Sequence, residues 1–480
     1  MDGLGGLPDC GQVFGRVLQR KDEMKMINPK KVLIHAQILN QIRQDARTWQ
    51  PKGLESGGYL VGRIHLPHLV SEVTDFIDGG PKAKRTPISF SGDSEYATKR
   101  KTEIQAVDQK KRLLAEYHLH PWNGRPSPSS GDLSQLQKVK DGKRPWYFIM
   151  MVNKDGFSFW DVDREGNQFI EIPHQVLHLP LQTEISTEKL LDRVLKVTQN
   201  QVLVTKTCAI IGLGSGGSVI AKYLSLTGIG RIILVDNDNF ELVNVVRHEG
   251  TIEDIGRPKT KICKKIVESH NPFVLVETYN IDALKEQKTL AEIIARSDLL
   301  VASSGNAKVN NFLNGIALEK KVPTVYGGIF AGAKGGYILP VVPEKTPCFN
   351  CLFDVASKSY HVDKDAAAAY NISEDELHAQ QGLWIDISIP ALLATKIALM
   401  IIQGQIEFLQ DYNFLLYKNP FEMQRLKLER RQDCVVCNFE GWAQRLERTM
   451  KPATEDCRKR GKPPTFGKVA DLFSRRNKKQ

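Results

Sequence analysis

Short apolar runs alternate with helical periodicity over residues 186–402 of the 480-residue chain. The runs 208–211, 231–235 and 298–302 are apolar and bounded by polar or glycine residues, which is typical of buried strands. Helical patterns are expected at 186–197 and 391–402. Strands that alternate with helices in this way indicate a Rossmann-like, doubly wound α/β domain.

The N-terminal third has a different pattern. Apolar stretches at 146–152 and 157–162 flank a polar Asn-Lys-Asp-Gly turn, which predicts a hairpin within a mixed sheet with a few helices. Residues 174–181 are interpreted as a linker. We predict a glycine-rich lead at 1–28, a mixed α/β domain at 29–180, the doubly wound domain at 185–445, and a poorly ordered basic tail at 446–480.

A glycine-rich turn directly follows the run 208–211. It reads Gly-Leu-Gly-Ser-Gly-Gly-Ser from Gly212, and Asp236 ends the next strand. Glycines let the backbone approach phosphate, and an acidic residue at this distance binds ribose hydroxyls. Alone, this weak fingerprint indicates a dehydrogenase. However, the amide, guanidinium and ammonium groups that follow suit a triphosphate better than a nicotinamide; they belong to Asn244, Arg247 and Lys259.

This order of residues resembles the ubiquitin-activating-enzyme superfamily, including its ThiF and MoeB types. Its members use ATP and magnesium to adenylate the C-terminal carboxylate of a ubiquitin-like or sulfur-carrier protein. The resemblance assigns phosphate binding to Gly212, Gly214 and Gly217, ribose binding to Asp236, and phosphate contacts to Asn244, Arg247 and Lys259. The alternative is an ordinary doubly wound fold with scattered surface charges.

The chain departs from this family at two places. The family's Asp-Asn pair after the strand 298–302 reads Gly305-Asn306 here, so a carboxylate that helps to hold magnesium is missing. Asp238 or a residue from another segment is left to hold the metal; otherwise the domain binds nucleotide without turning it over. The segment 353–384 also lacks the family's thioester cysteine, and we expect a crossover loop at 361–369. Cys457 in the tail is the reserve nucleophile.

Four of the eight cysteines form two CxxC pairs about eighty residues apart. Paired thiolates at this spacing bind one zinc ion tetrahedrally, and four protein ligands close the site, so this zinc is predicted to be structural. A dithiol redox centre is the alternative for one CxxC, but two pairs disfavour it. The predicted ligands are Cys348, Cys351, Cys434 and Cys437.

A second metal-binding pattern lies in the N-terminal domain. His118 and His120 alternate on an expected strand, so their side chains project to one face. Asp132, at the start of an expected helix, completes a three-ligand zinc site that keeps a position open for water. Glu55 is the candidate to take that water's proton. The alternative is a pair of polar histidines on a solvated face, followed by an ordinary turn.

This order resembles the JAMM (also MPN or JAB) metallopeptidases, which hydrolyse bonds after the C-terminus of ubiquitin-like proteins. The resemblance assigns catalytic zinc to His118, His120 and Asp132, acid/base catalysis to Glu55, and oxyanion support to Ser129. The combined resemblance is to a bacterial fusion of this peptidase with an activating enzyme. We therefore expect zinc-dependent deconjugation or processing together with ATP-dependent adenylation. The alternatives are sulfur-carrier activation and a scaffold that binds nucleotide without adenylation.

Charge and composition narrow the partners. The net charge of +11 includes +7 from residues 451–480, where ten basic residues outnumber three acidic ones, so nucleic acid is an unlikely partner. No apolar run is expected to span a membrane, and unpatterned cysteines favour the cytoplasm. The expected partners are a ubiquitin-like or sulfur-carrier protein bound by its C-terminus, a conjugating enzyme and a second copy of the chain. Arg193 is either the arginine that reaches a dimer partner's triphosphate or a surface charge.

Overall fold

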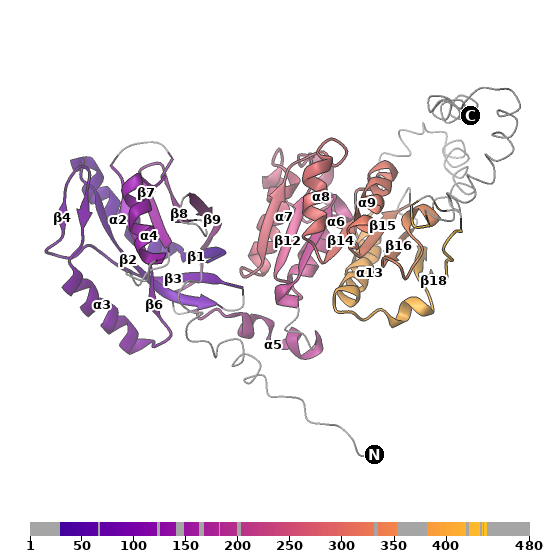
Figure 1. The fold of residues 1–480 in the computed structure, drawn as a ribbon, viewed down its shortest axis with the longest axis horizontal. Coiled ribbons are helices and arrows are strands. Elements are labelled where there is room, and N and C mark those ends of the chain that lie inside the picture. Colours follow the sequence, from indigo (N-terminus) through magenta and orange to yellow (C-terminus); the bar gives the residue numbers. More distant parts are fainter. Residues whose placement is uncertain are drawn as a thin grey trace, which may run out of the picture. The chain divides into compact units, whose positions relative to one another are not determined.

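The structure is a computed structural model that describes residues 29–438, apart from 66–67, 122–124, 141–147, 163–167, 182, 199–202, 331–334, 353–381, 419–421, 433 and 435. The chain divides into two compact units (Figure 1), which are described separately. The first holds residues up to 205 and 268–275, and the second holds 206–267 and the residues from 276 onward. The predicted lead, the crossover loop at 361–369 and the tail with Cys457 lie outside the described residues.

An eight-stranded mixed sheet forms the first unit, in the order β10-β1-β3-β2-β6-β7-β8-β9. The strands are β1 (Lys31–His35), β2 (Ser56–His65), β3 (Val70–Ile77), β6 (Arg112–Leu119), β7 (Phe148–Asn153), β8 (Gly156–Val162), β9 (Phe169–Ile172) and β10 (His174–Leu177), with a small β4–β5 hairpin (Lys84–Arg85, Phe90–Ser91). β1 pairs in parallel with β10 and β3, as β6 does with β7, whereas β2 is antiparallel to both neighbours. The predicted mixed sheet is confirmed, but β10 occupies part of the segment interpreted as a linker.

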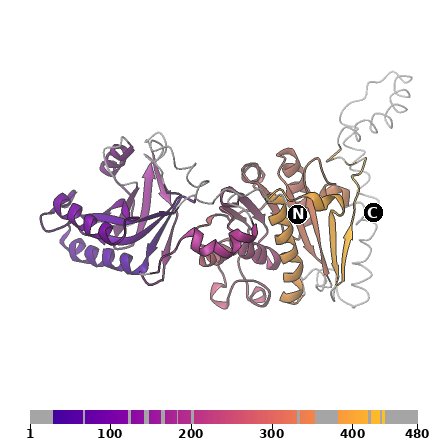
Figure 2. The ribbon, with the colours of Figure 1, turned by 90° about the horizontal axis from the view of Figure 1, so that it is seen from below.

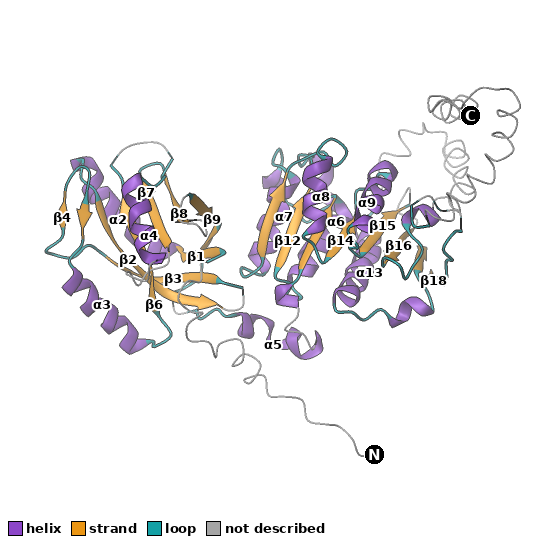
Figure 3. Cartoon of the chain, viewed as in Figure 1, coloured by secondary structure: helices purple, strands orange, loops and turns teal. Residues whose placement is uncertain are grey.

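Helices of the first unit, purple in Figure 3, are α2 (Ala36–Trp49), α3 (Ser94–Val107), α4 (Ser130–Lys140) and α5 (Thr187–Thr198). α2 buries Ile38 and Ile42, which are spaced to share one helical face, in the same core as Tyr117 of β6. Asp45 of α2 also accepts hydrogen bonds from Tyr117 Oη at 2.5 Å and Ser56 Oγ at 3.0 Å. Since successive strand residues face opposite sides, Tyr117 points toward α2 and its neighbour His118 points away from it.

The second unit is built on another eight-stranded sheet, in the order β13-β12-β11-β14-β15-β16-β17-β18. Its strands are β11 (Thr207–Ile211), β12 (Arg231–Val235), β13 (Leu275–Tyr279), β14 (Leu299–Ala302), β15 (Thr324–Ile329), β16 (Gly335–Val341), β17 (Phe414–Lys418) and β18 (Glu422–Leu426). β11 is parallel to both β12 and β14, and β15 is parallel to β14. The three predicted strands are therefore confirmed, and the strand order reverses between β11 and β14, where open α/β sheets bind ligands.

Helices of the second unit are α6 (Ser215–Ser225), α7 (Lys259–His270), α8 (Gln287–Ala295), α9 (Ala307–Glu319) and α13 (Trp384–Ile402), and the 3₁₀ turns η4 (Leu242–Arg247) and η5 (Ile252–Asp254) follow β12. α13, orange in Figure 2, packs against α6, β15 and β16.

α13 corrects two expectations. This 19-residue helix is long and apolar enough to cross a membrane, judged by length and composition alone, whereas no such apolar run was expected from the sequence. Within its most apolar stretch, 56% is buried inside the protein. The helix also begins seven residues before the predicted start and contains Pro390. Proline removes one backbone donor, but Pro390 and its apolar neighbours Ile387 and Ala391 are buried, and this burial outweighs the loss.

Candidate nucleotide and metal sites

The glycine loop follows β11 at the strand-order reversal. Gly212 has φ +90°, a left-handed conformation, and a Cβ there would lie 2.6 Å from Ser304 in the loop after β14. A Cβ at Gly217 would lie 2.0 Å from the Gly212 carbonyl oxygen. Gly214 caps α6. These glycines let the loop close against its neighbour, and the amides that begin α6 form an anion-binding helix start.

Two polar side chains hold Leu213, the buried residue at the centre of this loop. Asp236 Oδ2 accepts a hydrogen bond from Leu213 N at 2.6 Å, and its Oδ1 accepts one from Asp238 N at 2.8 Å. Burial raises the pKa of Asp236, although both backbone donors act to lower it. His248 Nε2 donates to the Leu213 carbonyl at 2.9 Å. Asp236 therefore shapes the loop; its binding to ribose stays a prediction.

Sequence reasoning missed His248. This residue is 7% exposed, and its Nδ1 accepts a hydrogen bond from Gly250 N at 2.8 Å while Nε2 donates to Leu213. Burial lowers the pKa of His248, which favours the neutral ring that this pair of hydrogen bonds requires. No local sequence signal marks the residue, because its partner lies 35 positions earlier.

The residues predicted to contact phosphate lie in different surroundings. Lys259 begins α7, is 9% exposed and pairs through Nζ with Asp238 Oδ2 at 2.7 Å. Asn244 Oδ1 accepts from Glu241 N at 3.0 Å and so caps η4, which ends at Arg247. Arg193 is exposed on α5 of the first unit. Lys259 and Asp238 thus meet beside Asp236. Phosphate binding by Asn244, Arg247 and Arg193 stays a prediction.

The missing magnesium aspartate has a backbone explanation. Gly305 has φ +66°, a left-handed conformation that most side chains disfavour, although no atom would lie within 4 Å of a Cβ there. Asn306 accepts hydrogen bonds from Lys308 N and Val309 N and caps α9. The side chain of Asp238 is 59% exposed and pairs with Lys259; its binding to magnesium stays a prediction.

The four predicted zinc-binding cysteines converge. Their sulfur atoms all lie within 4.8 Å of one another, with Cys348–Cys434 at 3.6 Å and Cys351–Cys437 at 3.4 Å. Four thiolates about 2.3 Å from one tetrahedral zinc ion lie about 3.8 Å apart. The donor set and spacing therefore fit zinc, although the two pairs are 86 positions apart.

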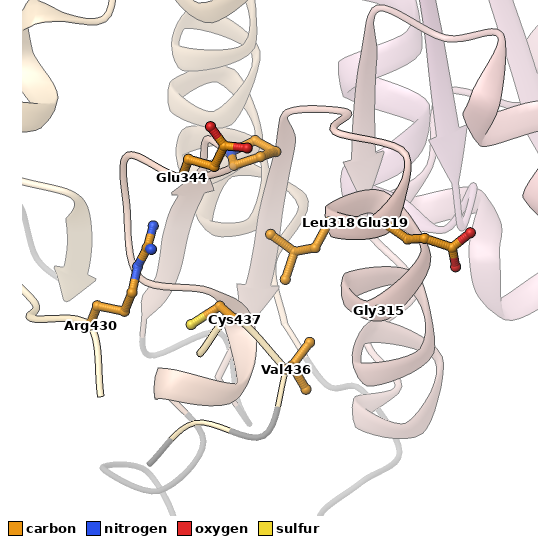
Figure 4. Close-up of a pocket in the computed structure, with 8 residues that line it drawn as sticks. Gly315, Leu318, Glu319, Glu344, Arg430, Val436 and Cys437 are labelled. Atoms are coloured by element: carbon orange, nitrogen blue, oxygen red, sulfur yellow. The ribbon is translucent and has the colours of Figure 1, made fainter. Parts of the chain in front are cut away.

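A pocket of about 300 Å³ lies beside this cysteine cluster (Figure 4). It is lined by Cys437, Leu318 of α9 and the charged side chains of Glu319, Glu344 and Arg430. Arg430 donates to the Thr346 carbonyl, and Glu344 pairs with Lys321 at the surface.

In the first unit, the structure brings the predicted ligands His118, His120 and Asp132 together. One donor atom from each lies within 4.8 Å of the others, and all three residues are at most 5% exposed. His118 Nδ1 lies 2.8 Å from Asp132 Oδ1, and His120 Nε2 lies 3.6 Å from Asp132 Oδ2. Two nitrogens and a carboxylate oxygen in a buried cluster are a donor set that suits zinc.

Burial and hydrogen bonds shift the pKa values of the titratable groups in and beside this cluster. Burial lowers the pKa of His118, but hydrogen bonds to Asp132 and Glu116 outweigh it and raise the value to about 10. Burial lowers the pKa of His120 to about 4 and raises that of Glu55, on which Asp132 and His118 act in opposite directions. Glu55 is 8% exposed, so it is buried like the three clustered residues; its part in catalysis stays a prediction.

Ser129 and Glu116 add to this arrangement. Ser129 Oγ donates to Asp132 Oδ2 at 2.7 Å and its backbone N donates to the same atom, so Ser129 orients the carboxylate; oxyanion support stays a prediction. Glu116 was missed, although it lies two residues before His118 and therefore on the same face of β6. Strand alternation alone contains that signal.

The ThiF family model matches residues 187–437, which is slightly more than half of the chain. The chain belongs to the ThiF family. The matched span covers most of the second unit, including the glycine loop, Lys259 and the four cysteines, so the predicted ThiF/MoeB-type adenylation domain is confirmed. The JAMM/MPN resemblance of the first unit lies outside the matched residues.

Relatives of the ThiF-family unit match short spans. The chain is 30% identical over 155 residues to the SAMP-activating enzyme E1 of Haloferax volcanii, covering 32% of this chain and 56% of that protein. It is 33% identical over 148 residues to the sulfur carrier protein adenylyltransferase of Thermus thermophilus, covering 30% and 54%. The Escherichia coli molybdopterin-synthase adenylyltransferase is 31% identical over 144 residues, covering 30% and 57%. The chain spans about half the length of these curated relatives.

Among solved structures, E. coli MccB matches with a TM-score of 0.44 and 21% identity, covering 53% of this chain and 73% of that chain. Each of the three sequence relatives is named either as an adenylyltransferase or as an activating enzyme.

Proposed function

We propose that the ThiF-family unit binds magnesium ATP and adenylates the C-terminal carboxylate of a small ubiquitin-like or sulfur-carrier protein. The supporting observation is that a glycine loop, an acidic residue and a buried lysine meet at the strand-order reversal. In this reaction a carboxylate oxygen attacks the α-phosphorus of ATP, an acyl-adenylate forms, and pyrophosphate leaves. The name of one relative, the sulfur carrier protein adenylyltransferase, favours a sulfur carrier as the acceptor.

Each residue has a part in this proposal. The loop amides and the start of α6 face phosphate oxygens, and Lys259 neutralises charge on the phosphates after exchanging its pairing with Asp238. Asp238 is then available to magnesium. Asp236 and His248 hold Leu213 so that the loop keeps its shape before ATP binds.

The test incubates the full chain with ATP, magnesium and each small ubiquitin-like protein of the same organism, and intact-mass spectrometry detects an AMP adduct. Wild-type protein is expected to produce AMP-linked carrier, and Lys259→Ala is expected to produce little. ATP binding without an adduct on any carrier contradicts adenylation and favours a nucleotide-binding scaffold.

The buried cluster in the first unit favours a second function. We propose that His118, His120 and Asp132 hold zinc and that this unit hydrolyses a peptide or isopeptide bond after a ubiquitin-like C-terminus. Bound zinc polarises the scissile carbonyl and acidifies water. Glu55, whose pKa burial raises, is placed to accept and return a proton, and Ser129 holds the Asp132 carboxylate.

Cleavage of a carrier extended at its C-terminus tests the peptidase. Glu55→Gln is expected to abolish cleavage with zinc content unchanged, because Glu55 is assigned to proton transfer and not to metal binding. Full cleavage by this variant contradicts the assignment. We further propose that the chain assembles with a second copy of itself, works with a conjugating enzyme, and acts in the cytoplasm.

A further inference from the structure

The His118 imidazole lies between two buried carboxylates, one on each ring nitrogen. Nδ1 is 2.8 Å from Asp132 Oδ1, and Nε2 is 2.8 Å from Glu116 Oε1. The side chains of His118 and Glu116 are each 7% exposed. An imidazole's two nitrogens point away from each other, so Nδ1 faces Asp132 while Nε2 faces Glu116.

We propose that Glu116 is a positioning residue of the zinc site. It accepts the Nε2 hydrogen of His118, which fixes the ring orientation and leaves the Nδ1 lone pair for the ion. Histidine ligands commonly donate their second ring hydrogen to a carboxylate, and this contact selects the tautomer that binds metal. This inference rests on the zinc site of the proposed peptidase.

The position of Glu116 in the strand supports this role. β6 places Glu116 and His118 on one face, and Tyr117 between them turns into the opposite core. A carboxylate on a side chain that is only 7% exposed is costly to bury without a hydrogen-bond donor.

The experiment compares zinc binding by full-length wild-type, Glu116→Ala and Glu116→Gln proteins through chelator competition. His118→Ala provides the zinc content of the four-cysteine site alone. Glu116→Ala is expected to weaken the first-unit site about 10–100-fold, the range found when such outer partners are lost. Glu116→Gln keeps the volume and a neutral acceptor, so its loss is expected to be smaller. Glu103→Ala, at an exposed glutamate of α3, is the matched control.

Histidine ¹⁵N NMR of the zinc-loaded protein gives a second readout. The inference predicts that His118 binds metal through Nδ1 and keeps its hydrogen on Nε2. Metal on Nε2, or unchanged zinc affinity in both Glu116 variants, overturns the inference and leaves the peptidase proposal standing. Equal zinc content in wild-type and His118→Ala proteins contradicts the peptidase proposal itself. If Glu116→Ala does not fold, the Gln variant and the NMR tautomer decide.

Discussion

Replacing His248 with phenylalanine tests how the nucleotide loop is held. Phenylalanine keeps an aromatic ring beside Phe240, whose ring centre lies 4.9 Å from that of His248, but it removes both hydrogen bonds. The lost bonds measure 2.9 Å to the Leu213 carbonyl and 2.8 Å from Gly250 N. Each is worth about 0.5–1.5 kcal/mol net, so we expect about 1–3 kcal/mol of local destabilisation.

Two assays read this change in the full chain. Hydrogen exchange is expected to quicken in peptides that cover 212–218, because the Leu213 carbonyl is no longer held. If about 1–2 kcal/mol of the ATP-binding free energy must then be used to order the loop, calorimetry will show about 5–30-fold weaker ATP affinity. His178→Phe, at an exposed histidine, is the matched control. Unchanged ATP affinity alongside faster exchange refutes the proposal that His248 prepares the loop.

The pH dependence of His248 has a definite sign. Burial lowers its folded-state pKa below the ordinary value of 6.5, so the unfolded state binds the proton more tightly. The contribution to stability is therefore fully present above pH 6.5 and is lost as pH falls through the folded pKa. Faster loop exchange on acidification is expected in wild-type protein, and His248→Phe is expected to lack that change.

Four further substitutions test other parts of the account. Lys259→Ala is expected to weaken ATP binding at least tenfold without altering peptidase activity. A parallel loss of peptidase activity in this variant contradicts the independence of the two units. Asp238→Asn is expected mainly to raise the magnesium concentration that the reaction requires. Cys434→Ser is expected to release one zinc per chain and lower the unfolding temperature of the second unit, and zinc-free protein of unchanged stability rules out a structural site. Glu72→Gln removes a buried carboxylate that accepts hydrogen bonds from His35 and His65. Burial acts to raise the pKa of Glu72, but these hydrogen bonds outweigh it and lower the pKa to about 2. Stability of roughly 3 kcal/mol is expected to be lost at neutral pH, and the difference from wild type should vanish as pH falls from 4.5 through 2; a pH-independent difference argues against the ion pair.

Features encoded by local periodicity were predictable. The strands 208–211, 231–235 and 298–302, the glycine turn and the two CxxC pairs depend on neighbouring residues or fixed spacing, and the structure confirms where they lie. The convergence of His118, His120 and Asp132 was also predictable, because strand alternation and one turn bring them together.

Features that depend on tertiary contacts were not predictable. His248 acts on a carbonyl 35 positions away, and no spacing rule links the two. Gly305 reads as a lost carboxylate in sequence, yet its φ of +66° shows a backbone reason for glycine. The expected helix began after Pro390, whereas α13 begins at Trp384 and continues through this buried proline.

ATP–pyrophosphate exchange tests the central claim most directly. The full chain is mixed with ATP, magnesium, labelled pyrophosphate and the small ubiquitin-like protein that acquires an AMP adduct, and the control carrier lacks its C-terminal residue. Adenylation predicts label in ATP only with the intact carrier, and a sharp decrease in Lys259→Ala. Exchange that is absent with every carrier, although ATP binds, contradicts the adenylation proposal.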